Sequence, residues 1–160
     1  LERARGMDVP TLVIERHEFA DDAAFGRAVW EALRPHRPDL IVLAGFLCFL
    51  PVPDEWNRRV INIHPALLPA FGGKGYYGER VHRAVLRAGA TTSGCTVHFV
   101  DNQYDHGPIL LQRTVPVVPG DTPESLAQRV FEAECEAYPE AIQRLADGRG
   151  KPGSGPGDSA

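Results

Sequence analysis

The chain has 160 residues, enough for one compact domain that buries roughly two-thirds of the surface its unfolded form exposes. Its apolar content of 43% and charged content of 24% are ordinary for a globular protein. The net charge of −4 leaves no basic footprint for nucleic acid, no apolar run approaches the roughly 20 residues that cross a bilayer, and no signal peptide opens the chain. We therefore expect neither nucleic acid nor a membrane as a partner.

Three cysteines, Cys48, Cys95 and Cys135, lie far apart and lack any Cys-x-x-Cys spacing. This pattern favours reduced thiols and a cytoplasmic protein over a disulfide scaffold or a cysteine-built zinc site.

The chain opens on LERARGMD, which predicts the last turns of a helix, so we expect the sequence to lack its natural beginning. Apolar and β-branched runs then predict strands, and apolar residues at helical spacing predict helices. Asp21 or Asp22 is expected to cap the first long helix, and Asp121 or Thr122, followed by Pro123, the last one. The predicted elements are a strand at 11–15, a helix from 21 or 22 to about 34, strands at 39–46 and 60–64, a helix at about 79–88, strands at 92–100 and 108–117, and a helix ending near 146.

This order predicts an α/β domain over residues 1–147, with a mostly parallel sheet flanked by helices and an antiparallel excursion near its end. Residues 148–160 contain Gly, Pro and Ser in place of apolar side chains, and we expect them to form a disordered tail.

Asn62 and His64 stand two places apart in the apolar run VINIH, so on a strand they project from the same face. Pro65 follows, and it ends regular pairing because it has no backbone N–H. Both side chains are therefore expected near the carboxyl end of a strand, where open α/β sheets bind ligands. An amide donor and an imidazole aimed at one point suit an oxyanion site for acyl transfer. The alternative is a polar strand end whose hydrogen bonds are satisfied within the fold.

A second candidate is the polar segment DNQYDHGPIL, residues 101–110, which links two predicted strands. Asp101 or Asp105 can hold a neighbouring imidazole in its charged form, because an opposite charge within a few ångströms favours ionisation. Taken by itself, the segment is better explained as a turn built from Asp, Gly and Pro.

The loop FGGKGYYG suggests an anion cradle, but no Ser or Thr follows Gly73-Lys74 as a phosphate-binding loop of the Walker type requires. The spacings of His64, His98 and His106 match no usual zinc pattern, and we expect no metal site. His98 lies inside an apolar strand and is expected to be a hydrogen-bonded core residue.

Four segments together resemble the folate-dependent formyltransferases, and within them the phosphoribosylglycinamide (glycinamide ribonucleotide) formyltransferases of purine synthesis. They are NIHPALLP, FGGKGYYG, SGCTVHFVDNQYDHGPILLQ and RVFEAECEAYPEAI. The resemblance extends from residue 1 to about 149 and implies a Rossmann-like sheet. It also implies that a strand, a phosphate-holding turn, a helix and a second strand precede Leu1, so that residues 1–160 alone would be inactive or badly destabilised.

The resemblance assigns roles to the candidate residues. Asn62 and His64 would bind the formyl oxygen, with His64 as general acid, and Asp105 would keep His64 protonated near neutral pH. Glu134 would hydrogen-bond the substrate ribose. The folate would be held by Leu47, Cys48, Phe49, Leu50, Asn62, Asp101 and Tyr104.

The implied reaction transfers formyl from 10-formyltetrahydrofolate, as co-substrate, to the amine of glycinamide ribonucleotide by direct attack, in a cytoplasmic monomer or homodimer. One departure concerns Asp21 and Asp22, which stand where the family often carries a basic residue near the acidic tail of the folate. Two alternatives remain open, namely a formyltetrahydrofolate hydrolase and an inactive, truncated folate-binding remnant.

Overall fold

The structure is a computed structural model that describes residues 1–148. Apart from Gly148, the predicted tail lies outside the described residues. The chain forms two compact units, which are described separately. The first consists of residues 1–38 and Cys48–Pro51, and the second contains Asp39–Leu47 and the chain from Val52 onward.

The first unit is built on helix α2 (Asp22–Leu33), which follows the short helix α1 (Glu2–Arg5). Asp21 caps α2 as predicted, because its Oδ1 accepts a hydrogen bond of 2.7 Å from the Ala24 N–H. Trp30 is buried, and its Nε1 donates to the Pro51 carbonyl at 2.7 Å, which ties the second segment of this unit to α2.

The strand predicted at residues 11–15 does not form, and this prediction is wrong. The segment contains no regular secondary structure, and Leu12 and Val13 are exposed. An apolar, β-branched run becomes a strand only when a neighbour accepts and donates its backbone hydrogen bonds.

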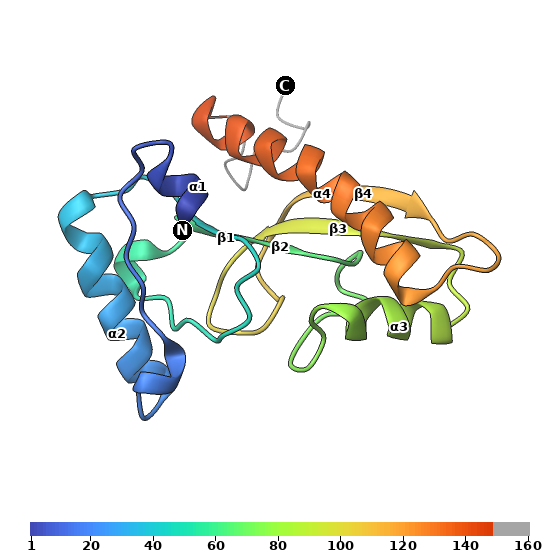
Figure 1. The fold of residues 1–160 in the computed structure, drawn as a ribbon, viewed down its shortest axis with the longest axis horizontal. Helices are drawn as coiled ribbons and strands as arrows, with labels where there is room; N and C mark the ends of the chain where they lie inside the picture. Colours follow the sequence, from blue (N-terminus) through green and yellow to red (C-terminus); the bar gives the residue numbers. More distant parts are fainter. Residues whose placement is uncertain (149–160) are drawn as a thin grey trace, which may run out of the picture. The chain divides into compact units, whose positions relative to one another are not determined.

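The second unit contains a four-stranded sheet in the order β1 (Ile41–Leu43), β2 (Val60–His64), β3 (Thr92–Phe99) and β4 (Ile109–Pro116) (Figure 1). Strand β1 pairs parallel to β2, whereas β2 with β3 and β3 with β4 pair antiparallel. The α/β fold is confirmed. Within the described residues the parallel part is limited to β1 and β2, and β1 is much shorter than the predicted 39–46.

The register of β2 and β3 decides which side chains share a face. Asn62 lies opposite His98 and His64 opposite Thr96, so these four polar residues lie on one face of the sheet. The intervening residues Ile61, Val97 and Phe99 point to the other face, where they join the hydrophobic core.

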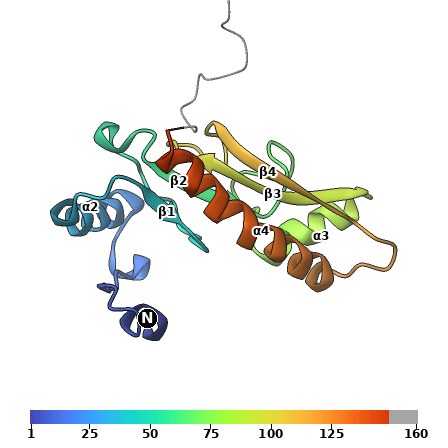
Figure 2. The same ribbon diagram turned by 90° about the horizontal axis from the view of Figure 1, so that it is seen from above.

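Helix α4 (Pro123–Ala146) covers this apolar face, and Figure 2 shows it lying along the strands. Thr122 and Ser125 form a capping box at its start, as expected from Thr122-Pro123. Tyr138 fixes α4 to the sheet, since its hydroxyl contacts the carbonyls of Leu43 at 2.6 Å and Ile61 at 3.1 Å.

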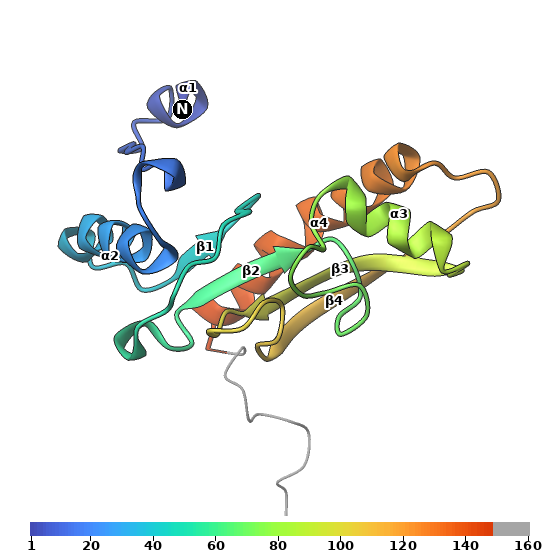
Figure 3. The ribbon, with the colours of Figure 1, turned by 90° about the horizontal axis from the view of Figure 1, so that it is seen from below.

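Helix α3 (Glu79–Arg87) follows β2 after a loop of fourteen residues, 65–78, that Figure 3 shows as a green coil beside the strands. The helix packs Val85 into the core and lies beside the first turns of α4 (Figure 1).

Candidate active site

His64 occupies the last position of β2 and is almost fully buried, with 4% of its surface exposed. Its Nε2 lies 2.8 Å from the carbonyl oxygen of Phe71, and its Nδ1 lies 3.5 Å from Oδ2 of Asp105. Both ring nitrogens therefore face acceptors, and only a doubly protonated ring satisfies both.

Burial nevertheless lowers the pKa of His64 below its ordinary value, and the Asp105 carboxylate and the Phe71 carbonyl raise it by less. The nearby His98 lowers the pKa further. The role of Asp105 in keeping His64 protonated near neutral pH therefore stays a prediction. The two acceptors are placed to stabilise the charged ring, and burial opposes them.

Asp105 is brought to His64 by the loop between β3 and β4. Its backbone has a φ of 51°, in the left-handed region that Asp tolerates better than most residues. Burial opposes ionisation of the carboxylate, but its contact with His98, the His64 charge and the Gly73 N–H, which donates to Oδ2 at 2.9 Å, together lower the pKa of Asp105. Asp105 is therefore ionised at neutral pH.

Asn62 lies one pleat before His64, and its Nδ2 is 3.3 Å from Nε2 of His98. Nδ1 of His98 lies 2.8 Å from the Phe99 carbonyl, and its Nε2, beside the Asn62 amide, lies 3.7 Å from Oδ1 of Asp105. His98 is thus the hydrogen-bonded strand residue that the sequence predicts, and it fixes the orientation of the Asn62 amide. Among the described residues the Asn62 side chain has no other hydrogen-bond partner, which leaves donor capacity for a ligand.

The glycine-rich loop passes close to both His64 and Asp105. Phe71 adopts a φ of 55°, which is unusual for an aromatic residue and turns its carbonyl toward His64. Gly72 permits this path, because a Cβ there would lie 2.4 Å from Cδ2 of Leu68 and 3.3 Å from Cβ of Asp105.

Thr96 and Gln112 hold the start of this loop, and the sequence analysis missed both. The Thr96 hydroxyl donates to the Ala66 carbonyl at 2.6 Å and accepts from the Leu68 N–H at 3.0 Å. The Gln112 amide donates to the Leu68 carbonyl at 3.0 Å and to the Thr96 hydroxyl at 2.9 Å. No local pattern in the sequence marks them, because the register that places Thr96 opposite His64 is set by the sheet.

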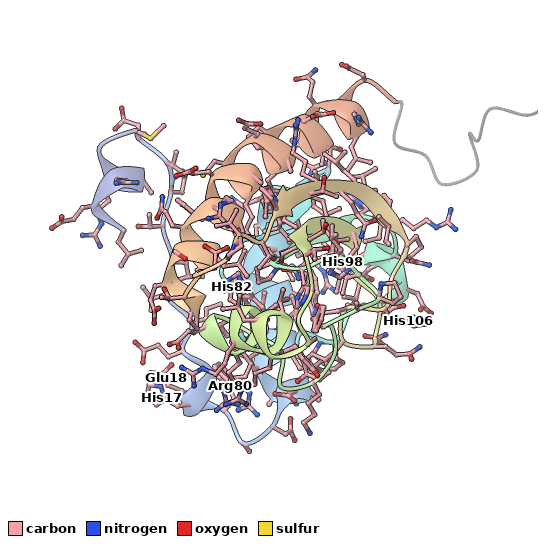
Figure 4. The ribbon with its side chains drawn as sticks, turned by 90° about the vertical axis from the view of Figure 1, so that its right-hand side faces the viewer. His17, Glu18, Arg80, His82, His98 and His106 are labelled. Carbon is pink, nitrogen blue, oxygen red and sulfur yellow. The ribbon has the colours of Figure 1, made fainter. Side chains whose placement is uncertain are left out.

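Asp101 makes its contacts within its own loop, through the Gln103 N–H and His106, both at 2.8 Å. Tyr104 is exposed. Asn102, which was not singled out from the sequence, anchors the loop by pairing its side-chain amide with both backbone groups of Val52. Figure 4 shows His98 within the sheet and His106 at the outer end of this region.

Glu134 lies on α4 in the stripe that faces the sheet, between Val130 and the buried Ala137 and Tyr138. It is half-buried, burial raises the pKa of its carboxyl, and no described residue pairs with it. Glu134 also raises the pKa of the Cys95 thiol, which burial already raises, to about 11. Its helix covers the face of the sheet opposite Asn62 and His64.

Four of the seven predicted folate residues divide between the two units. Leu47 belongs to the second unit and is 69% exposed, whereas Cys48, Phe49 and Leu50 belong to the first. Their assignment stays a prediction.

Within residues 1–148, no three or more His, Cys, Asp or Glu side chains gather in a way that could hold a metal ion. No helix in the same range combines the length and the apolar character needed to cross a membrane.

Comparison with known sequences connects this geometry to one family. The sequence profile of the formyl transferase family matches residues 1–142. The chloroplastic phosphoribosylglycinamide formyltransferase of Arabidopsis thaliana is 45% identical over 152 residues, which cover 92% of this chain and 52% of that protein. The protein of the same name from Vigna unguiculata is 43% identical over 148 residues, covering 91% of this chain and 47% of that protein. The chain thus spans about half the length of these relatives.

Solved structures give the same result. Glycinamide ribonucleotide transformylase 1 from Symbiobacterium toebii superposes with a TM-score of 0.84 at 42% identity, over 92% of this chain and 68% of that chain. Phosphoribosylglycinamide formyltransferase from Brucella melitensis superposes with a TM-score of 0.79 at 40% identity, over 99% of this chain and 77% of that chain.

Proposed function

The chain belongs to the formyl transferase family, and we propose that it carries the formyl-transferring site of a phosphoribosylglycinamide formyltransferase. The formyl group would pass from 10-formyltetrahydrofolate to the amine of glycinamide ribonucleotide, in purine biosynthesis. The observation that supports this best is the convergence of Asn62, His64 and Asp105 at the end of β2.

Asn62 and His64 would hold the formyl oxygen. The unpaired hydrogen of the Asn62 amide is one donor, and the His64 Nε2–H is the second once it leaves the Phe71 carbonyl. We propose that the formyl oxygen takes the place of that carbonyl. As the amine nitrogen bonds to the formyl carbon, the C=O electron pair moves to this oxygen, and both donors stabilise its charge.

His64 would then move the proton. The attacking nitrogen becomes positively charged and loses a proton to a water molecule. A protonated His64, held by Asp105, would give its Nε2 proton to the folate nitrogen as the carbon–nitrogen bond breaks, and would take up a proton from solvent afterwards. Burial lowers the pKa of His64, which makes the charged ring a stronger acid for this step.

Glu134 would accept hydrogen bonds from the ribose of the substrate. A half-buried carboxylate that has no partner among the described residues is costly to keep, and sugar hydroxyls would satisfy it. Binding of the folate by Leu47, Cys48, Phe49, Leu50, Asp101 and Tyr104 remains a proposal from the family resemblance.

The cellular location and assembly remain proposals as well. The cysteine pattern favours a cytoplasmic protein, whereas the two plant relatives are named as chloroplastic, and assembly as a monomer or homodimer is proposed without a sequence signal.

Replacement of Asn62 tests the oxyanion site. In Asn62→Ala, the rate of formyl transfer to glycinamide ribonucleotide, followed by mass spectrometry of the formylated product, should fall on the order of 100-fold or more. The matched control is Asn57→Ala, at an exposed turn, which should transfer at the wild-type rate. Transfer by Asn62→Ala within threefold of wild type, with the fold intact by circular dichroism, would contradict this role.

A further inference from the structure

A second concave site lies beside the loop that holds His64. It is a pocket of about 450 Å³ lined by Phe71, Tyr76, Arg80, Arg83, Ala84, Arg87 and Ala88. This volume falls in the range typical of small-molecule sites. Apart from Phe71, whose carbonyl contacts His64, none of these residues takes part in the proposed formyl transfer.

The arginines form one row along α3. Arg80, Arg83 and Arg87 are spaced at i, i+3 and i+7, so they share a face of the helix, and the small Ala84 and Ala88 leave a recess between them. The opposite face of α3 carries the buried residues Val81 and Val85. In Figure 4, Arg80 and the buried His82 lie on opposite sides of the α3 ribbon.

The row is poorly placed for the stability of the helix. Arg80 lies in the first turn, where the helix dipole disfavours a cation, and like charges at these spacings repel one another. Acidic groups neutralise only Arg83, the middle arginine of the row. Glu79 pairs with it, and Glu124 of α4 also interacts with it. Among the described residues neither Arg80 nor Arg87 has a carboxylate partner. An anionic ligand would relieve this repulsion.

Aromatic rings complete the pocket. Tyr76 is exposed and Phe71 is half-buried, so both can offer a ring to a planar group. The Arg80 guanidinium lies 4.7 Å from the centre of the Tyr77 ring, which limits its freedom and preorganises it for an anion. Arginine forks beside aromatic rings recognise a phosphate joined to a planar base.

We propose that this pocket binds an organic phosphate of the nucleotide class, with Arg80 and Arg87 on the phosphate and Tyr76 and Phe71 beside the base. The ligand would also act on the loop that holds His64. Phe71 lines the pocket with its side chain and contacts His64 Nε2 through its carbonyl, and Gly73 donates to Asp105. A bound nucleotide would therefore order residues 71–78.

Isothermal titration calorimetry of the chain with adenosine 5′-monophosphate tests the site without any need for formyl transfer. The expected result is one binding event that weakens at least tenfold in the double variant Arg80→Ala/Arg87→Ala. The matched control is Arg27→Ala, an exposed arginine on α2, which should bind as wild type does. Wild-type affinity in the double variant would overturn the proposal.

Two further probes test the ligand class. Adenosine without phosphate and inorganic phosphate alone should each bind at least tenfold more weakly than the nucleotide. Equal affinity for adenosine would contradict the role of the arginines, and equal affinity for phosphate would contradict that of the rings. Hydrogen exchange of residues 71–78 should slow when the nucleotide is added to wild type and stay unchanged in the double variant. Unchanged exchange in wild type would contradict the link to the loop.

Discussion

At the scale of single residues, opposing effects act on the proton of His64, the central residue of the candidate site. Removal from water favours the neutral ring, whereas Asp105 and the Phe71 carbonyl favour the charged one, and burial has the larger effect. The unfolded chain therefore binds this proton more readily than the folded one. Through His64, stability is fully present above about pH 6.5 and is lost as pH falls through the lower folded pKa.

Removal of the Asp105 charge should make His64 a weaker base. In Asp105→Asn the stabilising charge disappears while burial remains, so the pKa of His64 should fall below its wild-type value. Titration of the histidine ring carbons by NMR measures this directly, with the exposed His17 as an internal reference. An unchanged or raised pKa of His64 would show that Asp105 does not act on the ring.

Glu134 should favour binding at the expense of folding. An ionised carboxylate that is half-buried and has no described partner destabilises the fold, and this cost appears as pH rises through its raised pKa. Glu134→Gln should therefore increase the free energy of unfolding at pH 7, measured with urea. The same change should raise KM for glycinamide ribonucleotide roughly 10-fold, because hydrogen bonds to a charged group are lost.

The exposed Glu132→Gln on the same helix is the matched control for both measurements. If Glu134→Gln lowers the stability at pH 7, its carboxylate has a partner in the fold. An unchanged KM would remove Glu134 from the substrate site.

At the scale of elements, the end of β2 and the loop after it position the site. The antiparallel register places Asn62 and His64 on the same face as His98 and Thr96. Thr96 then fixes the backbone of Ala66 and Leu68, which determines where the chain enters the glycine-rich loop. The position of the Phe71 carbonyl therefore depends on a hydroxyl on the neighbouring strand.

Thr96→Val keeps the shape of the side chain and removes these hydrogen bonds. Because the group is fully buried, the free energy of unfolding should fall by about 1–3 kcal/mol. Formyl transfer should fall as well, since the loop start is released. Thr114→Val on the exposed surface of β4 is the matched control and should change neither quantity. Equal stability of the two variants would show that the hydroxyl does not anchor the loop.

Local signals in the sequence predicted those elements whose causes are local. The caps at Asp21 and Thr122 and the strand at 60–64 depend on neighbouring residues, and all three are present. The strand at 11–15 failed because strand pairing depends on a partner that lies outside the run. Gln112 went unnoticed because it acts on the backbone of Leu68, 44 residues away.

The candidate site likewise contains residues that local spacing predicts and residues that it does not. The two-residue period of a strand places Asn62 and His64 on one face, but no spacing brings Asp105 to them, and that assignment came from the family resemblance. The direction of the His64 pKa shift could not be predicted from the sequence, because burial sums the effect of every element packed around the ring.

At the scale of the whole molecule, family membership and the arrangement of the candidate residues both support the proposed formyl transfer. The profile matches residues 1–142 and the Symbiobacterium toebii structure covers 92% of the chain, whereas the geometry concerns a few atoms around His64. Both are consistent with transfer to an amine. Hydrolysis by the same residues would transfer the formyl group to water. Release of tetrahydrofolate would then need no glycinamide ribonucleotide, whereas transfer to the amine requires it.

The most direct test is the rate of tetrahydrofolate release from 10-formyltetrahydrofolate, measured with and without glycinamide ribonucleotide, in the wild type and in His64→Ala. We expect release only when the ribonucleotide is present, and a decrease of ~10²–10⁴-fold in the variant. Equal release without the ribonucleotide, or a variant that works at nearly the wild-type rate, would contradict amine formylation at His64.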